Sequence, residues 1–341
     1  MPWFAPVFWG EPPGFLAGLL SPIGAAYDTA GRLRRTISRC YRATVPVVCV
    51  GNLVAGGAGK TPVALAIAIW LVERGIPVHV VTRGYGGRLR GPVRVDPTHH
   101  DALAVGDEAL LLATRAPCWV ARDRAAGVRA AVAGGAGAIL LDDGLQNPAV
   151  AKTLGLIVVD GGYGFGNRRV IPAGPLRENL RRGLARADAV VLLAAEGDGS
   201  EAWVMQPDCK VPVLNAVLAP VDGERLAGVR LLAFAGIGRP EKFFATLRAL
   251  GAELVSTRAF PDHHPFGVAE LEGLRRDAER SGARLITTAK DIVRVPSAQH
   301  TGIEVLDVEV RWSDLIALER LCGRVVRSDD GSRSKPALHL R

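Results

Sequence analysis

The stretch that decides the fold runs from residue 46 to residue 73 and reads PVVCVGNLVAGGAGKTPVALAIAIWLVE. Its first five residues are apolar and rich in valine, as in a buried strand, and an apolar helix-like run begins at Val63. Between them lies a glycine-rich loop that ends in Lys60 and Thr61. A strand, a glycine loop, Lys-Thr and a helix form the context of a phosphate-binding Walker A loop. The sequence therefore predicts an α/β nucleotide-binding domain.

The residue types of this loop suit a nucleotide phosphate. Glycines let backbone N–H groups turn toward a phosphate, the lysine would reach the β and γ phosphates, and the threonine would hold Mg²⁺. The expected nucleotide-binding residues are Gly56, Gly57, Ala58, Gly59, Lys60 and Thr61. Val54 stands where the full motif has its first glycine, so this chain carries the GGxGKT core only.

A second segment, GAILLDDGLQ at 137–146, supports the same interpretation. Its apolar run ends in Asp142 and Asp143, as in a Walker B strand. Acidic residues at the carboxyl end of a parallel strand lie at the crevice where ligands bind, and they can contact Mg²⁺ or its shell. We expect a magnesium role for this pair, and which of the two aspartates contacts the ion stays open.

Three shorter polar segments follow or precede apolar runs. TRGYGG at 82–87 places Tyr85 in either a substrate-contacting loop or a simple turn. GDEALLLATR at 106–115 opens a helix with Asp107, which could be a general base for a hydroxyl or a helix N-terminal acid. FPDHHPF at 260–266 has two adjacent histidines but no spaced third ligand, so a histidine paired with a carboxylate is favoured over a zinc site.

Residues 161–187 form a long stretch with glycine clusters, prolines and many arginines. A stretch of this length with little regular structure is usually functional in a compact domain. Its basic character favours an anionic substrate or nucleotide. Nucleic acid is not expected, because few aromatic residues are interleaved with the arginines.

Residues 12–27 carry no formal charge and are followed by a basic cluster. The stretch is too short to span a bilayer, and its positive charges follow it, whereas those of a signal peptide precede it. It predicts either a helix in the membrane interface or a helix packed on the domain. The residues that could share an apolar face are Phe15, Leu16, Leu19, Leu20 and Ile23, with Trp3, Phe4, Phe8 and Trp9 upstream.

Composition limits the class of protein. The chain has 341 residues, 48% hydrophobic and 22% charged, which is typical of a globular protein of two α/β domains. No apolar run reaches about 18 residues, so a multi-span membrane protein is excluded. The five cysteines are scattered, so neither a disulfide framework nor a structural zinc site is expected, and a reducing cytoplasm fits.

Apolar runs and helical stretches alternate, which predicts a doubly wound, mostly parallel sheet with a second, smaller α/β domain. The expected strands of the sheet are 46–50, 78–82, 117–121, 138–142, 156–160 and 189–193, and those of the smaller unit are 213–218, 231–235, 285–288 and 304–310. The expected segments are an N-terminal membrane-associating helix with its basic flank at 1–40, a P-loop domain at 41–206, the smaller domain at 207–327 and a disordered tail at 328–341.

Taken in order, these segments resemble the tetraacyldisaccharide 4'-kinases of lipid A biosynthesis, from about residue 8 to residue 325. The matching segments are VGNLVAGGAGKTP at 50–62, TRGYGG at 82–87, GDEALLLA at 106–113, DDGLQ at 142–146, GFGNRRVIPAGPLRE at 164–178, AGIGRPEKFF at 235–244 and FPDHHPF at 260–266. Three positions depart from the family pattern: Asn147 replaces a common histidine, Thr82 a common serine, and Ala289 a usual acid. The departures at Asn147 and Ala289 leave any role at those positions open.

The resemblance implies a peripheral enzyme at the cytoplasmic face of the bacterial inner membrane, held there by the N-terminal helix. It would use ATP and Mg²⁺ to phosphorylate the 4' hydroxyl of an acylated disaccharide 1-phosphate. It implies neither nucleic acid nor an obligate protein partner. The implied residues are Asp107, His263 and Lys60 for catalysis, Gln146 for the nucleotide, Glu178 beside Thr61 and the two aspartates for the metal, and Tyr85, Arg122 and Arg177 for the substrate.

Asp107 and His263 belong to different sequence units, so they could meet only across a cleft between domains, and domain closure would then assemble the site. Two other classes of function share part of the pattern. A deviant P-loop GTPase or ATPase, acting as a metallochaperone or switch, would need a guanine-specifying N-K-x-D, which the sequence lacks. A non-catalytic membrane scaffold that only binds nucleotide would form no ADP in response to an acceptor.

Overall fold

The structure is a computed structural model that describes residues 6–194 and 211–326. Three expectations fall outside these residues: the aromatic pair Trp3 and Phe4, the domain boundary between 206 and 207, and the tail at 328–341.

A nine-stranded sheet forms the larger part of the molecule, in the order β13-β8-β7-β6-β1-β5-β2-β4-β3. All neighbouring strands are parallel except the outermost pairs, β13 with β8 and β3 with β4. Six strands lie within two residues of their predicted positions, which confirms the doubly wound sheet. The strands are β1 (Val47–Gly51), β2 (Val78–Thr82), β3 (Val93–Arg94), β4 (Cys118–Val120), β5 (Ala138–Asp142), β6 (Leu154–Asp160), β7 (Ala189–Leu193), β8 (Val213–Pro220) and β13 (Val308–Trp312).

Helices cover both faces of this sheet. One face packs against α2 (Lys60–Val72), α4 (Asp107–Ala113) and α10 (Leu315–Val326), and the other against α5 (Arg124–Ala133) and α6 (Leu180–Leu184). Successive residues of β1 alternate between these two cores, with Val48 in one and Cys49 in the other. Because both faces are buried, the strands read as continuous apolar runs, and this is why they could be found in the sequence.

A smaller four-stranded sheet, in the order β10-β9-β11-β12, is parallel throughout. Its strands are β9 (Arg230–Ala235), β10 (Glu253–Ala259), β11 (Arg284–Thr288) and β12 (Ile303–Leu306). The helix α7 (Pro240–Ala249) packs on one face, and α8 (Val268–Arg280) packs on the other. The sequence did not predict β10, because this edge strand is half-exposed and carries no apolar run.

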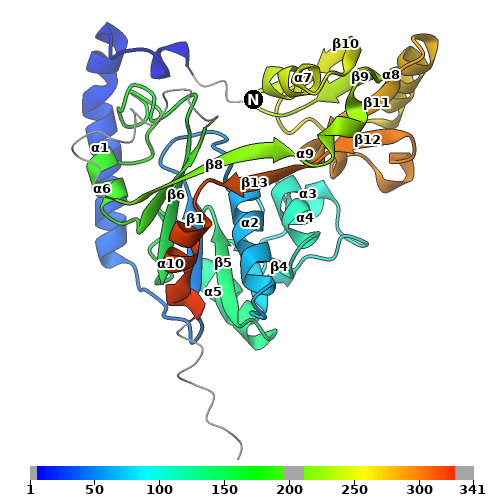
Figure 1. The fold of residues 1–341 in the computed structure, drawn as a ribbon. Coiled ribbons are helices and arrows are strands. Elements are labelled where there is room, and N and C mark those ends of the chain that lie inside the picture. Colours follow the sequence, from blue (N-terminus) through cyan, green and yellow to red (C-terminus); the bar gives the residue numbers. More distant parts are fainter. Residues whose placement is uncertain (1–5, 195–210, 327–341) are drawn as a thin grey trace, which may run out of the picture.

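Two segments assigned to the smaller unit from sequence belong to the large sheet instead. The strand β8 pairs with β7, and the segment expected as one strand at 304–310 divides at Asp307 into β12 and β13. The strand β13 pairs with β8, and α10 joins the large core (Figure 1). The smaller unit is therefore an insertion between Val221 and Asp307, whose backbones are joined by a 3.0 Å hydrogen bond.

The N-terminal helix α1 (Phe15–Ile37) runs along one flank of the molecule (Figure 1). Its buried residues Ala17, Gly24 and Asp28 face the domain. The opposite face exposes Phe15, Leu16, Leu19, Ile23, Tyr27, Leu33 and Ile37. The helix therefore docks on the domain by one stripe, as the second alternative predicted, and leaves an apolar face uncovered. Its place in a membrane interface stays a prediction.

The residues upstream of α1 differ from the expectation at one position. Trp9, expected beside the apolar face, is 2% exposed, and its indole N–H donates to the carbonyl of Pro172 at 3.0 Å. Trp9 lies in the short 3-10 helix η1 (Val7–Trp9). No helix within the described residues is both long and apolar enough to cross a bilayer. The remaining short helices are α3 (Ala102–Val105), α9 (Ala289–Ile292), η3 (Gly223–Leu226) and η4 (Ser297–Gln299).

Candidate functional site

The glycine loop connects the end of β1 to the first residue of α2, as the sequence predicts. Gly56 and Gly59 have φ of +112° and +77°, a region that favours glycine because it has no side chain. A Cβ at Gly59 would also lie 2.4 Å from Leu193 Cδ1. At Gly56 and Gly57 a Cβ would meet nothing within 4 Å, so the backbone there borders open space in front of the helix N-terminus. This is the arrangement that binds phosphate.

Lys60 and Arg177 converge on Asp143. The Lys60 Nζ lies 3.8 Å from Asp143 Oδ2, and Arg177 Nη1 donates to both carboxylate oxygens at 2.8 and 2.9 Å. Burial acts to raise the pKa of Asp143, but Lys60 and then Arg177 outweigh it and lower that pKa. Asp143 is therefore a carboxylate held between two cations beside the phosphate loop.

The carboxyl group of Asp142 differs from that of Asp143 in its hydrogen bonds and in its pKa. The side chain of Asp142 is buried, its Oδ2 accepts a 3.2 Å hydrogen bond from Thr82, and its Oδ1 has no hydrogen-bond partner among the residues that the structure describes. Burial, followed by the charges of Glu108 and Asp143, raises the pKa of Asp142 to about 7. A buried carboxylate oxygen without a partner beside a phosphate loop fits a hard cation such as Mg²⁺.

Glu178 lies behind the loop and is surrounded by donors. It accepts from Gln146 Nε2 at 3.1 Å and from Arg186 Nη2 at 2.5 Å, and Arg35 of α1 lies 3.4 Å away. Gln146 Nε2 also donates to the carbonyl of Asn52 at 2.9 Å. Because two arginines and an amide engage its oxygens, this geometry favours a supporting role for Glu178 over direct metal ligation.

The arginine-rich stretch is attached to the phosphate loop through its backbone. The N–H of Arg177 donates to the Leu53 carbonyl at 2.8 Å, and the N–H of Ala55 donates to the Pro175 carbonyl at 2.7 Å. These bonds attach residues 175–177 of the stretch to the phosphate loop, and its anionic partner stays a prediction.

Asp107 and His263 meet across the two units. Asp107 is the first residue of α4, and His263 follows β10 in the smaller unit with φ of +61°. The His263 Nδ1 lies 2.9 Å from Asp107 Oδ2, and the ring of Tyr85 lies 5.7 Å from the imidazole. Burial opposes ionisation of Asp107, but the hydrogen bond with His263 and the charge of Lys290 outweigh it and lower the pKa.

Asp107 is also a helix N-terminal acid, because it lies in the first turn of α4 and its Oδ1 accepts from the Glu108 N–H at 3.0 Å, while Gly106 occupies the N-cap position. The helix α4, which begins at Asp107, packs in the same core as α2, which begins at Lys60. The pair and the phosphate loop therefore lie at the starts of two neighbouring helices. Arg122 has an exposed side chain and a backbone N–H bonded to the Arg90 carbonyl at 2.8 Å, so its substrate role stays a prediction.

The sequence did not predict two arginines of the site whose side chains are buried. Arg124 donates to the backbone carbonyls of Asp142 at 3.1 Å and Ala121 at 3.0 Å. Arg294 lies 3.5 Å from Asp107 Oδ2. Neither belongs to a glycine-rich or paired-acid motif, so the sequence around them carries no distinguishing pattern.

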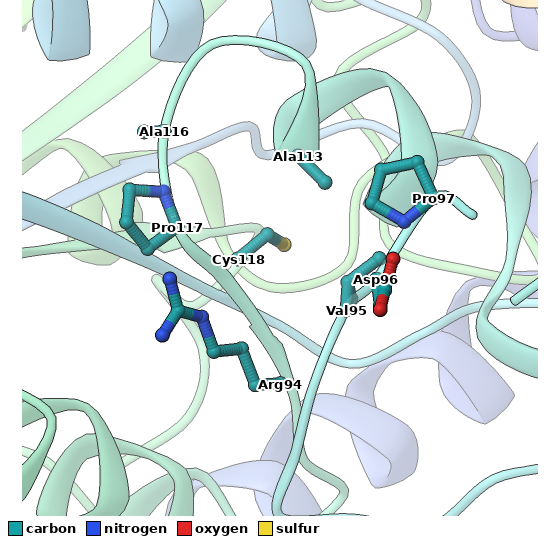
Figure 2. Close-up of a pocket in the computed structure, with 8 residues that line it drawn as sticks. All are labelled: Arg94, Val95, Asp96, Pro97, Ala113, Ala116, Pro117 and Cys118. Atoms are coloured by element: carbon teal, nitrogen blue, oxygen red, sulfur yellow. The ribbon is translucent and has the colours of Figure 1, made fainter. Parts of the chain in front are cut away.

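A pocket of about 720 Å³ lies elsewhere, between β3, α4 and the start of β4 (Figure 2). Cys118 is the first residue of β4, so the pocket is at the amino end of the parallel strands. The phosphate loop follows the carboxyl end of β1, which is the ligand-binding end of such sheets. This pocket is therefore separate from the site.

Known proteins are similar to this chain in sequence and in fold. The family model described as Tetraacyldisaccharide-1-P 4'-kinase matches residues 16–325. A tetraacyldisaccharide 4'-kinase of Rhodospirillum centenum is 51% identical over 332 residues, which cover 96% of this chain and 98% of the relative. Its namesake from Rhodospirillum rubrum is 50% identical over 325 residues, covering 94% and 98%.

A solved structure is similar to this chain in fold. The crystal structure of "apo" form LpxK from Aquifex aeolicus in complex with ATP has a TM-score of 0.74 and 25% identity, and the match covers 91% of this chain and 99% of that one. The family match spans both sheets, the phosphate loop and the residues that face it. This chain therefore belongs to the tetraacyldisaccharide-1-P 4'-kinase family.

Proposed function

We propose that this chain transfers the γ-phosphoryl group of ATP to the 4' hydroxyl of a tetraacyldisaccharide 1-phosphate, the activity for which its relatives are named. The observation that carries the proposal is the meeting of Asp107 and His263, from two units, beside an intact phosphate loop. A kinase needs both a phosphate cradle and a group that receives the acceptor proton. A nucleotide switch or a scaffold needs only the first.

In this proposal the loop backbone and Lys60 hold the phosphates of ATP. Thr61, Asp142 and Asp143 would hold Mg²⁺, which neutralises charge on the phosphates when it is bound. Arg177 orients Asp143 through its hydrogen bonds and would also contact the substrate. Glu178 and Gln146 support the loop from behind.

Asp107 would accept the proton of the 4' hydroxyl. The lowered pKa keeps its carboxylate ionised at neutral pH, and the hydrogen bond with His263 fixes its orientation. Tyr85 and Arg122 would contact the substrate. We place the acceptor between the large sheet and the inserted unit, so that closure of the two units completes the site and excludes water.

The membrane role rests on α1. Its uncovered apolar face and the arginines near its carboxyl end would seat the protein on an anionic bilayer surface, where an acylated acceptor resides. We propose a peripheral location at the cytoplasmic face of the inner membrane, with the lipid substrate and the membrane surface as partners and with no nucleic acid or obligate protein partner.

Transfer of label from ATP tests the function. The purified protein is incubated with γ-labelled ATP, Mg²⁺ and a tetraacyldisaccharide 1-phosphate, and the lipid fraction is analysed. The proposal expects label at the 4' position and ADP formation that depends on the acceptor. An equal rate of ADP formation with and without the acceptor, together with no labelled lipid, would refute the proposal.

A further inference from the structure

Arg294 is a buried cation beside the proposed base. It follows α9 in the smaller unit, and its side chain is only 4% exposed. Its Nε lies 3.5 Å from Oδ2 of Asp107, the same carboxylate oxygen that faces His263 Nδ1. His263 and Arg294 of the smaller unit thus face the same oxygen of Asp107. The contact with Arg294 is an ion pair, because the Nε–H itself donates to the Lys290 carbonyl at 3.3 Å.

The rest of the guanidinium holds the loop that carries His263. Nη1 donates to the carbonyls of Gly236 at 3.0 Å and His264 at 3.3 Å, and Nη2 donates to Asp291 Oδ1 at 2.6 Å. The Gly236 carbonyl also accepts the N–H of His263 at 3.1 Å. One planar group therefore contacts both the carboxylate of the large unit and the backbone that presents its histidine partner.

Asp291 keeps Arg294 in this position. It is fully buried and accepts from the Gly236 N–H at 2.9 Å and from Thr288 Oγ1 at 2.6 Å, in addition to the guanidinium. A buried arginine that is paired and fully hydrogen-bonded has a fixed orientation. Lysine could not reproduce it, because one ammonium lacks the planar fork that reaches several acceptors at once.

The other charged groups around Asp107 are less constrained. Lys290 is 29% exposed on its side chain and lies 3.7 Å from Asp262, which also faces His263 Nε2 at 3.7 Å. Glu108 is the neighbour on α4. Of the cations that act on Asp107, Arg294 is the one that is nearly fully buried.

We propose that Arg294 is a positioning residue that holds Asp107 and the His263 loop in register across the two units. This inference rests on the proposed role of Asp107 as the proton acceptor. Loss of Arg294 would remove one of the two contacts between Oδ2 of Asp107 and the smaller unit, and it would loosen at Gly236 the loop that presents the other contact, His263. A displacement of about 1 Å at such a site can cost roughly 10² in rate.

Kinetics of Arg294→Gln and Arg294→Lys test the inference. We expect Arg294→Gln to lower kcat by about 10²-fold with little change in the KM for ATP, because the phosphate loop is untouched. Arg294→Lys keeps the charge without the fork and should retain more activity. The matched control is Arg275→Gln, since Arg275 bonds Gln299 in the same unit and does not contact the site.

A double-mutant cycle separates positioning from general support of the fold. If Arg294 acts through Asp107, adding Arg294→Gln to Asp107→Asn costs no further activity. Losses that multiply, or a normal kcat in both Arg294 variants, would overturn the inference. If Arg294→Gln fails to fold, the cycle is run with Arg294→Lys. A normal kcat in Asp107→Asn alone would instead refute the proposed base.

Discussion

Two adjacent carboxylates, Asp142 and Asp143, differ because their neighbours differ. Asp143 lies between Lys60 and Arg177, which lower its pKa, whereas Asp142 is buried with one threonine donor and has a raised pKa. The sequence identified the pair but left open which of the two would contact the metal. The Oδ1 of Asp142 has no hydrogen-bond partner within residues 6–194 and 211–326, which favours that residue as the direct ligand that we propose.

The phosphate loop gives the first prediction at the residue scale. Lys60→Ala removes the cation beside Asp143, and Thr61→Ala removes the hydroxyl expected on Mg²⁺. Each should abolish phosphoryl transfer while leaving the fold intact, which label transfer and a thermal melt would measure. Thr114→Ala is the control, because that exposed threonine caps its own helix turn far from the loop in the sequence. Near-normal transfer by either loop variant would show that the loop assignment is wrong.

Asp107 gives a pH dependence. The pKa of Asp107 in the folded chain is lowered, so the ionised side chain stabilises the fold above its unfolded pKa of about 3.9. That contribution is lost as the pH falls through the folded pKa. Urea unfolding should therefore find Asp107→Asn less stable than the parent at pH 7, with the difference shrinking below about pH 4. A difference that is constant with pH would exclude a stabilising ionised Asp107.

Helix α1 has two different faces that its sequence did not distinguish. Its sequence predicted an uncharged apolar segment, and the structure divides the helix into a docked stripe and an open face. The stripe includes Asp28, which accepts from the Asn179 N–H at 3.0 Å and pairs with Arg182. Arg35, in the last turn of the helix, lies beside Glu178. The helix is thereby joined to the segment that borders the phosphate loop.

Two glycines of α1 form a matched pair. A Cβ at Gly24 would lie 2.7 Å from the Val170 carbonyl oxygen, whereas a Cβ at Gly18 would meet nothing within 4 Å. Gly18→Ala should stabilise the protein by up to about 1 kcal/mol through helix propensity. Gly24→Ala should lower the stability and loosen the helix, because backbone stands in the way. Chemical denaturation of the two variants would measure this, and equal effects would contradict the docking geometry.

The open face of α1 gives a prediction about membranes. Leu19 and Ile23 are 63% and 57% exposed, so changing both to serine should leave the fold intact. Removing this apolar surface should weaken binding to anionic vesicles in a flotation assay. Ile69→Ser on α2 is the control, since that side chain is 40% exposed on another helix. Unchanged vesicle binding of the double variant would refute the interfacial role.

The burial of each strand explains whether the sequence predicted it. Strands buried on both faces, such as β1 and β5, are almost entirely apolar and were predicted to within one residue of their observed positions. The edge strand β10 is half-exposed and reads ELVSTRA, so it was missed. Local pattern shows that a segment forms a strand, but pairing is decided by distant partners.

At the scale of the whole molecule, this limit produced the error in domain organisation. β8 and β13 were placed in the smaller unit because they flank its strands in sequence, yet they pair with each other at the edge of the large sheet. The inserted unit is thus attached by two neighbouring connections (Figure 1). The sequence did indicate that Asp107 and His263 would have to meet across the units, and they do. It gave no sign of Arg294, whose role depends entirely on tertiary contacts.

The proposed proton transfer depends on the meeting of Asp107 and His263. A double-mutant cycle in the label-transfer assay tests whether the two residues act together. Asp107→Asn should lower kcat by about 10² to 10⁴, the usual contribution of a general base, with little change in ATP affinity. His263→Ala should also lower kcat, and the double variant should be little worse than the poorer single variant, since the two residues act as a unit. A normal kcat in Asp107→Asn, or losses that multiply in the double variant, would contradict it.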